Sequence, residues 1–158
     1  VPSIIAKQES MNISLMKLGK QDIDKFIELI QLFEAVFEME DFTLPDKEHL
    51  QVVLEKKDFV AFVAMDENGV IGGLTAYTVE QYYSRKPLAF IYDIAIRTIY
   101  QRNGIGKNLI AALTDYCKNN GIEQMFVLAD SEDEHAVEFY RSTKATESKV
   151  INFDYYLK

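Results

Sequence analysis

The sequence predicts a mixed α/β domain around a central, mostly antiparallel sheet. At 158 residues, 48% of them apolar, the chain is long enough to bury one core. Segments of β-type alternation are interspersed with segments of helical spacing. An Asn-Gly turn joins two β-rich runs, and later a strand, a helix and a strand follow one another, which indicates a parallel crossover. We therefore expect about six strands flanked by four helices.

The N-terminal part supplies one strand and two helices. Residues 13–18 alternate weakly between apolar and polar side chains, which predicts the first strand. From Gln21 to Phe37 apolar residues recur every three or four positions and predict a helix with one buried face. Pro45 occupies a position that proline favours at the start of a helix, so a short second helix should run through Leu54.

Three strands and the crossover helix come next. Residues 59–65 and 70–79 flank the Asn-Gly turn and predict an antiparallel hairpin, and residues 88–96 predict a further strand. Residues 104–119 have helical spacing that stops before a glycine, a common end of a helix. Residues 125–129 are a short apolar run that predicts a buried strand.

The last part of the chain predicts one helix and one strand. Ser131 and Glu134 fit a capping box, which would start a helix that carries Tyr140. Residues 149–157 alternate between two sets of side chains, as a final, sixth strand would. These two elements complete the predicted fold.

Composition narrows the classes of partner. The chain has 25 acidic and 17 basic residues, a net charge of −8, which disfavours nucleic acid and favours cationic small molecules, although acidity also simply keeps proteins in solution. The lone Cys117, expected to be a buried apolar residue, suits the reducing cytoplasm. We predict one cytoplasmic domain over residues 13–158, without a membrane partner or a metal, after a disordered or non-native segment over residues 1–12.

Residues 101–106 read Gln-Arg-Asn-Gly-Ile-Gly and lie between a predicted strand and a predicted helix. The first turn of a helix has unpaired N–H groups at its positive end, and glycines let an anion approach the backbone closely. Arg102 and Lys107 add positive charge, so the segment suits a pyrophosphate, although two glycines also suit a plain tight turn. A dinucleotide fingerprint would need a third glycine at Leu109, and the ending of a P-loop is missing.

These residues resemble the Gcn5-related N-acetyltransferases (GNAT). The signature of that family, Arg/Gln-x-x-Gly-x-Gly/Ala, is matched by Gln101, Gly104 and Gly106. Residues 91–96 are similar to the family strand whose backbone pairs with the pantetheine arm of the cofactor. The resemblance implies acetyl-coenzyme A as the co-substrate, bound by Ile94, Ala95, Ile96, Gln101, Arg102, Asn103, Gly104, Ile105, Gly106, Lys107, Asp133 and Ala136.

Two residues are candidates for catalysis. Asp133, Ala136 and Tyr140 are similar to the family motif Asn-x-x-Ala-x-x-x-Tyr, with aspartate in place of asparagine. By this resemblance Tyr140 would protonate the departing thiolate, although its apolar surroundings also suit a core residue. Asp93 would remove a proton from the amine, or it would be a structural carboxylate that accepts backbone hydrogen bonds. In a regular strand its neighbour Tyr92 points to the opposite face, and a bulge would change this.

A second resemblance is carried by residues 32–37, 59–65, 72–77, 90–96, 129–130 with Asp133 and 136–137, and 152–154. These segments are similar to the aminoglycoside 3-N-acetyltransferases of the gentamicin-resistance type, and the likeness spans residues 13–157. This implies acetyl transfer to the 3-amino group of a gentamicin-like drug, and a homodimer in which the aromatic residues near the C-terminus pair with a partner strand. A polycationic drug calls for a pocket of acids, although each acid alone suits a solvated surface. The candidate substrate-binding residues are Glu40, Asp41, Tyr77, Glu80, Tyr92, Asp130, Glu134 and Asp154.

Two other functions stay open. The same fold would serve to acetylate a different amine, such as a polyamine, an amino sugar, or the N-terminus or a lysine of a protein. Alternatively, the chain is a non-catalytic module that binds acyl-coenzyme A through the turn.

Overall fold

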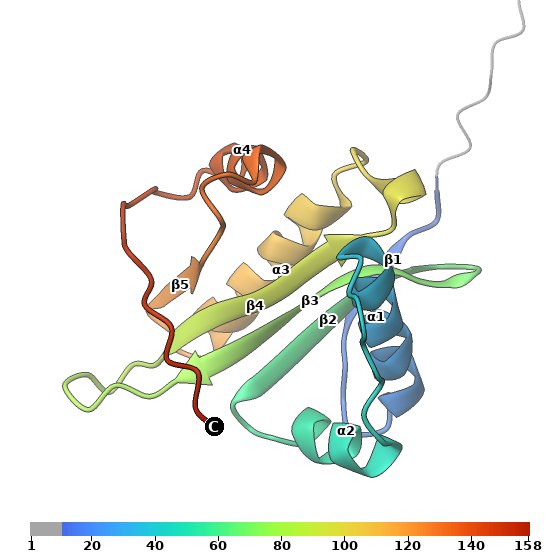
Figure 1. Ribbon diagram of the computed structural model, residues 1–158, viewed down its shortest axis with the longest axis horizontal. Coiled ribbons are helices and arrows are strands. Elements are labelled where there is room, and N and C mark those ends of the chain that lie inside the picture. Colours follow the sequence, from blue (N-terminus) through green and yellow to red (C-terminus); the bar gives the residue numbers. More distant parts are fainter. Residues whose placement is uncertain (1–10) are drawn as a thin grey trace, which may run out of the picture. The chain divides into compact units, whose positions relative to one another are not determined.

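The computed structural model describes residues 11–158, and the chain divides into two compact units, up to Val127 and from Leu128 onward (Figure 1). Residues 1–10, most of the segment for which we predicted disorder or a non-native origin, lie outside the described residues. The second unit contains the helix α4, Glu134–Ser142. The first contains β1 (Ser14–Lys17), α1 (Ile23–Val36), α2 (Lys47–Leu54), β2 (Phe59–Asp66), β3 (Gly69–Val79), β4 (Leu88–Ile96), the 3₁₀ helix η1 (Thr98–Tyr100), α3 (Ile105–Asn119) and β5 (Gln124–Val127).

The sheet confirms the predicted mixed topology. Its strands lie in the order β1-β2-β3-β4-β5, and every neighbouring pair is antiparallel except β4 and β5. The predicted hairpin is formed by β2 and β3, which turn between the paired residues Asp66 and Gly69. The parallel pair is joined through α3, as the crossover pattern predicted.

The prediction of a sixth strand is wrong. Residues 149–157 belong to no strand, and neighbouring side chains that should face opposite ways are both exposed, Val150 at 69% and Ile151 at 80%. An alternating pattern describes only which side chains share a face. A strand also needs a hydrogen-bonded neighbour, and this segment has none among the described residues.

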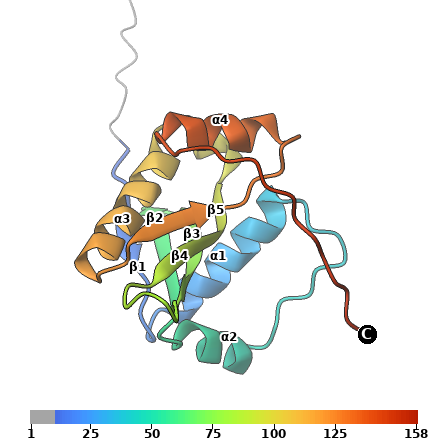
Figure 2. The ribbon, with the colours of Figure 1, turned by 90° about the vertical axis from the view of Figure 1, so that its left-hand side faces the viewer.

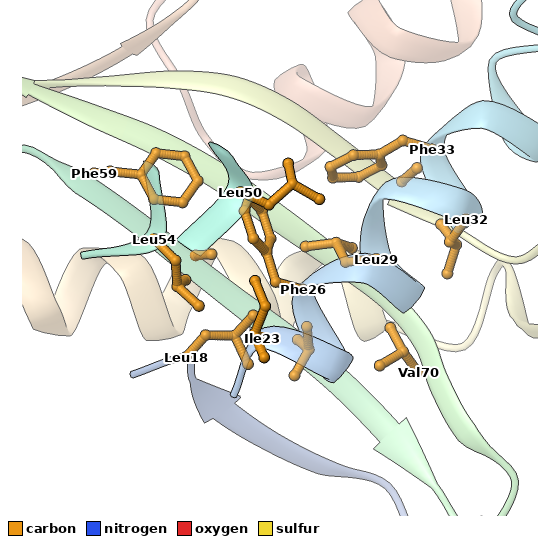
Figure 3. Packing of buried hydrophobic residues seen from close by; sticks show 13 residues of the cluster. Leu18, Ile23, Phe26, Leu29, Leu32, Phe33, Leu50, Leu54, Phe59 and Val70 are labelled. Carbon is orange, nitrogen blue, oxygen red and sulfur yellow. The ribbon is translucent and has the colours of Figure 1, made fainter. Parts of the chain in front are cut away.

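Helices cover both faces of the sheet (Figure 2). On one face α1 and α2 pack against β2 and β3, and Figure 3 shows Phe26, Leu29 and Leu32 of α1 among the buried side chains. On the other face α3 buries Leu113 and Cys117, which confirms the prediction of a buried cysteine. Each large side chain buried in this way contributes about 1.5–3 kcal/mol.

Helix α2 starts at Lys47, two residues later than Pro45 suggested. Asp46 is the N-cap, because its carboxylate accepts a hydrogen bond of 2.9 Å from the backbone N–H of His49. A capping carboxylate satisfies one of the unpaired donors of the first turn. Proline therefore precedes the cap here instead of opening the helix.

At Gly73 the Leu29 side chain of α1 lies directly against the backbone of β3. A Cβ atom there would lie 2.5 Å from Leu29 Cδ1 and 2.6 Å from the carbonyl oxygen of Phe62. We expect Gly73→Ala to lower the free energy of unfolding by about 1–3 kcal/mol, because a backbone oxygen has to move. Urea denaturation measures this. In the control Gly19→Ala, the new methyl group meets only the flexible end of Gln21, so equal losses in the two variants would contradict the argument.

Candidate active site

The turn over residues 101–106 follows β4 after Arg97 and the short helix η1, so the strand does not enter it directly. Its side chains fold back on the chain. The Asn103 amide donates to the carbonyl oxygens of Tyr100 and Gln101, both at 3.0 Å, and the Gln101 amide donates to that of Ile96 at 3.0 Å. Gly104, the N-cap of α3, has a left-handed φ of 77°. These bonds hold the turn in one shape.

A row of backbone donors is open at this turn. From Arg102 to Lys107, six consecutive N–H groups donate no hydrogen bond to any residue that the structure describes, and the first bond of α3 runs from the Asn108 N–H to Gly104 O at 3.0 Å. The Arg102 and Lys107 side chains are exposed, and the first turn of α3 contains no acid. This donor set fits a diphosphate, because open N–H groups, two cationic residues and the positive end of a helix lie within one short segment.

Contacts that the sequence did not reveal fix the segment before the turn. The Tyr100 hydroxyl donates to the Asp66 carboxylate at the end of β2, which lowers the pKa of Asp66. Arg97 Nε donates to the carbonyl oxygen of Val70 at 3.0 Å, and its backbone N–H to that of Ile71 at 2.8 Å. Tyr100 and Asp66 are 34 positions apart, and no local pattern connects them.

One edge of β4 is open next to the turn. β5 pairs only with Leu88 through Ile91, the first four residues of β4. In the part of the chain that the structure describes, the following stretch, which includes Ile94, Ala95 and Ile96, has no strand on that side. Unpaired backbone groups of this kind accept an extended ligand as an added strand.

β4 contains a bulge at Tyr92. Thr75 of β3 pairs with Asp93, and the next residue, Ala76, pairs with Ile91, so Tyr92 is the extra residue of β4. In a regular strand Tyr92 and Asp93 would point to opposite faces. The bulge is the feature that changes this alternation.

Tyr77, Tyr92 and Asp93 gather on the face of the sheet that α1 covers. Tyr77 packs against the core on that face, and the rings of Tyr77 and Tyr92 meet edge to face at 5.7 Å. Asp93 pairs with Thr75, which shares a face with Tyr77 because the two are two positions apart. Burial raises the pKa of Tyr77, and the charges of Tyr92, Asp58 and Asp93 add to this increase.

The Asp93 carboxylate is half-buried, and within residues 11–158 it accepts no hydrogen bond and forms no ion pair. Burial raises its pKa. A structural carboxylate would accept backbone donors, and this one does not, so that alternative has no support. A desolvated carboxylate without partners is able to take a proton from an ammonium group and attracts cations.

The three other candidate acids of the first unit do not lie next to Asp93 in the pairing between β3 and β4. Glu40 and Asp41 are exposed in the loop between α1 and α2. Glu80 follows Val79, which pairs with Leu88 at the start of β4, and Val79 lies about 13 Å along β3 from the partner of Asp93. The structure therefore places these three acids on loops, Glu80 beyond the far end of the strand pair.

In the second unit, α4 is capped by Asp133, whose carboxylate accepts from the Ala136 N–H at 3.0 Å. The predicted capping box from Ser131 is wrong. Asp130 shapes the preceding turn by accepting from the Glu132 N–H at 2.9 Å, and this moves the helix start past Ser131. Glu134 is exposed in the first turn of α4.

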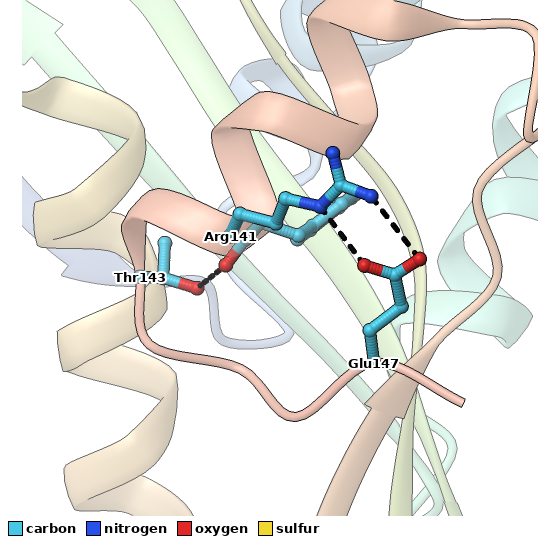
Figure 4. Close-up of polar contacts among 4 residues, drawn as sticks. Arg141, Thr143 and Glu147 are labelled. Atoms are coloured by element: carbon cyan, nitrogen blue, oxygen red, sulfur yellow. Dashed lines mark hydrogen bonds and ion pairs between the residues drawn. The ribbon is translucent and has the colours of Figure 1, made fainter.

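Beyond α4 the chain is held by an ion pair. Arg141 donates two hydrogen bonds to Glu147, of 2.9 and 3.2 Å (Figure 4). Tyr140 is half-buried, and its ring lies 5.1 Å from that of Phe139. Asp154 is exposed and accepts from the Asn152 amide. The meeting of Tyr140 and the acids of this unit with Asp93 stays a prediction.

Residues 11–158 contain no group of three histidine, cysteine, aspartate or glutamate side chains arranged to hold a metal ion. None of their helices combines the length and the apolar character needed to span a bilayer.

The profile of the acetyltransferase (GNAT) family matches residues 26–143, which include Asp93, the turn and Tyr140. The chain belongs to this family. It is therefore a GNAT N-acetyltransferase domain, and the fold and the family expected from the sequence are confirmed. No curated protein sequence matches the chain.

Solved GNAT structures resemble this one. The aminoglycoside acetyltransferase meta-AAC0020, from an uncultured soil metagenomic sample and crystallised with trehalose or with sisomicin, is 52% identical, with a TM-score of 0.91 over 92% of this chain and 97% of that chain. The aminoglycoside acetyltransferase HMB0005, from a similar sample, is 27% identical, with a TM-score of 0.88 over 94% and 100%. AAC(6')-Iy in complex with CoA shares the fold, at 20% identity and a TM-score of 0.76 over 94% and 97%.

Proposed function

We propose that this GNAT protein transfers the acetyl group of acetyl-coenzyme A to the 3-amino group of a gentamicin-like aminoglycoside and thereby confers resistance. The observation that carries the choice of acceptor is the 52% identity, over 92% of this chain, with an aminoglycoside acetyltransferase crystallised with sisomicin. The half-buried Asp93 supports the choice, because a polycationic substrate needs a carboxylate beside its reacting amine.

Acetyl-coenzyme A supplies an acetyl group activated as a thioester. The six open N–H groups from Arg102 to Lys107 would bind its pyrophosphate, with Gln101 and Asn103 holding the turn in shape. The open edge of β4 at Ile94–Ile96 would pair with the pantetheine arm. Asp133 and Ala136, which bond to each other at the start of α4, would complete the site by shaping that helix end.

Asp93 takes a proton from the ammonium group of the acceptor, directly or through water, and frees its nitrogen lone pair. The neutral nitrogen then forms a bond to the acetyl carbon as the bond from carbon to sulfur breaks, and the Tyr140 hydroxyl donates a proton to the departing thiolate. The nitrogen loses its second proton to solvent as the amide forms, and solvent returns a proton to Tyr140. Much of the acceleration comes from holding the two reactants together. The rings of Tyr77 and Tyr92 offer faces for sugar rings and ammonium groups next to Asp93.

The remaining positive charges of the drug call for further acids. We propose that a negative electrostatic potential at the acceptor site comes from six further acids. They are Glu40, Asp41 and Glu80 of the first unit and Asp130, Glu134 and Asp154 of the second. The net charge of −8 favours the approach of a polycation, and the effect should weaken as salt is added.

A thiol-release assay tests the choice of acceptor. With saturating acetyl-coenzyme A, gentamicin should give rapid release of free thiol, and spermidine or an amino sugar should give far less. Turnover with spermidine and none with any aminoglycoside would reject an aminoglycoside as the substrate while leaving the GNAT chemistry intact.

Tyr140→Phe should lower kcat about 100-fold, at the lower end of the range for a general acid, and leave both KM values unchanged. The reason is that only the transition state needs the proton that the hydroxyl supplies. Steady-state kinetics measure kcat and the two KM values separately. Tyr82→Phe, at a residue that is 99% exposed, is the matched control. An unchanged kcat in Tyr140→Phe would show that Tyr140 is not the general acid.

We also propose a homodimer that works in the cytoplasm, the compartment that suits the lone thiol of Cys117. Phe153 is 76% exposed and Tyr155 86% exposed in the C-terminal segment, and exposed aromatic residues mark surfaces that other chains cover. Light scattering should give twice the chain mass for the wild type and a lighter species for Phe153→Asp with Tyr155→Asp. A monomeric wild type would exclude the dimer.

A further inference from the structure

A cavity of about 410 Å³ lies away from the turn, at the edge of the first unit. It is formed where β1 ends, where α2 passes into β2, and by one residue of α3, Tyr116. Its charged lining consists of four lysines and one glutamate, in a chain whose net charge is −8. The charged residues are Lys17, Lys20, Lys56, Lys57 and Glu55.

The floor of this lysine cavity is apolar. Leu18, Leu54 and Phe59 are buried there, and Tyr116 adds a half-buried ring. The Lys17 ammonium lies 5.6 Å from the centre of that ring, within the range of a cation–π contact. Burial raises the pKa of Tyr116, so its hydroxyl stays neutral and is able to donate a hydrogen bond. The cavity therefore combines an apolar floor with a cationic rim.

The positive charge of the rim is not balanced by ion pairs within the described residues. The ion pairs found among residues 11–158 involve Lys25, Lys47 and Arg141, and none of the four cavity lysines. Glu55, the one acid in the lining, accepts a hydrogen bond of 2.8 Å from the Gln51 amide. The C-terminal end of α2 adds only about half a negative charge, which is too little to balance the lysines.

Two residues of the lining also have open backbone donors. The N–H groups of Lys20 and Lys57 donate no hydrogen bond to any residue from 11 to 158. A pocket with cations and open N–H groups selects for anions.

The lysine cavity is separate from the proposed active site. Tyr116 lies eleven residues beyond Ile105 on α3, about 16 Å along the helix from the turn. No residue of β4 lines the cavity. A cationic acceptor would be repelled by the lysines, so the cavity is not where an aminoglycoside binds.

We propose that the lysine cavity binds a small organic anion with at least two negative charges on a compact apolar body, of the aryl phosphate class. The lysine rim would take the dianion and the apolar floor would take the body. Its volume falls within the range of about 300–1,000 Å³ in which proteins bind small molecules. This binding is independent of the proposed acetyl transfer.

Calorimetry with 1-naphthyl phosphate tests the site. The protein is first saturated with coenzyme A, so that the turn is occupied. We expect saturable binding of one ligand per chain, weakened about tenfold or more by Lys56→Gln with Lys57→Gln. The control, Lys149→Gln with Lys158→Gln, removes the same charge from the C-terminal segment and should leave the affinity unchanged. The substituted residues Lys56, Lys57, Lys149 and Lys158 are all exposed, so both double variants should fold, and thermal unfolding checks this.

Two further comparisons separate the contribution of charge to ligand affinity from that of apolar burial. Neutral 1-naphthol should bind about tenfold more weakly than its phosphate, and Lys20→Gln should weaken the phosphate alone. Added salt should also reduce phosphate binding. An absence of saturable binding, equal affinities in the two double variants, or naphthol binding as tight as phosphate binding would each overturn the proposal.

Discussion

Asp93→Asn is expected to lower kcat about 100-fold or more while making the protein more stable at neutral pH. The loss follows from the missing proton acceptor, since general base catalysis contributes roughly 10²–10⁴-fold. The gain follows because burial raises the pKa of Asp93, so the folded protein holds its ionised form at a cost that asparagine does not have. A residue kept only for stability would not give both effects.

The pH dependence of the Asp93 effect has a definite sign. Because the folded pKa lies above the unfolded value, the carboxyl group stabilises the fold fully below its unfolded pKa, and this contribution is lost as the pH rises through the folded pKa. The melting temperature of Asp93→Asn should therefore exceed that of the wild type at neutral pH, and the difference should shrink in acid. Wild-type activity should rise with pH through the same range.

Paired melting curves and thiol-release rates across pH measure both effects. Asp115→Asn, at an exposed acid on α3, is the control and should change neither. An Asp93→Asn protein with wild-type turnover would remove Asp93 from the mechanism. One that is inactive and less stable would show that the carboxylate has a structural partner.

Gly104→Ala is expected to raise the KM for acetyl-coenzyme A about tenfold or more, with little change in the KM for the amine. A tenfold change corresponds to a loss of about 1.4 kcal/mol of binding free energy. No atom lies within 4 Å of the new Cβ, so the free protein has room for it, but φ is 77° there, which disfavours any side chain. That strain costs about 1–2 kcal/mol. The methyl group also projects at the turn where the pyrophosphate should approach.

Gly121→Ala is the matched control for the turn. Gly121 lies just past the other end of α3, also has a left-handed φ, of 70°, and also has no atom within 4 Å of a Cβ. Both variants should lose similar stability in urea denaturation, and only Gly104→Ala should lose affinity for acetyl-coenzyme A. Equal KM values in the two variants would contradict the assignment of the turn.

Local patterns predicted most of the fold correctly because they report on local physics. Helical spacing marked α1 and α3, and the Asn68-Gly69 pair marked the hairpin, since each depends on residues close in sequence. The turn could be proposed as a pyrophosphate site for the same reason. It is a contiguous segment whose glycines and basic residues can be read from the sequence alone.

Features that depend on distant pairing could not be predicted. The alternation of residues 149–157 could not show whether a neighbouring strand exists. The bulge at Tyr92 is a property of the register with β3, and the bond between Tyr100 and Asp66 joins distant segments. The lysine cavity is assembled from three separate segments, so its charge does not stand out along the chain.

The structure of the reaction product tests the proposed function most directly. Gentamicin is incubated with the protein and acetyl-coenzyme A, and the product is examined by mass spectrometry and NMR. We predict one added acetyl group, on the 3-amino nitrogen. Unmodified gentamicin would contradict the proposed substrate, and an acetyl group on any other nitrogen would contradict the proposed position of transfer.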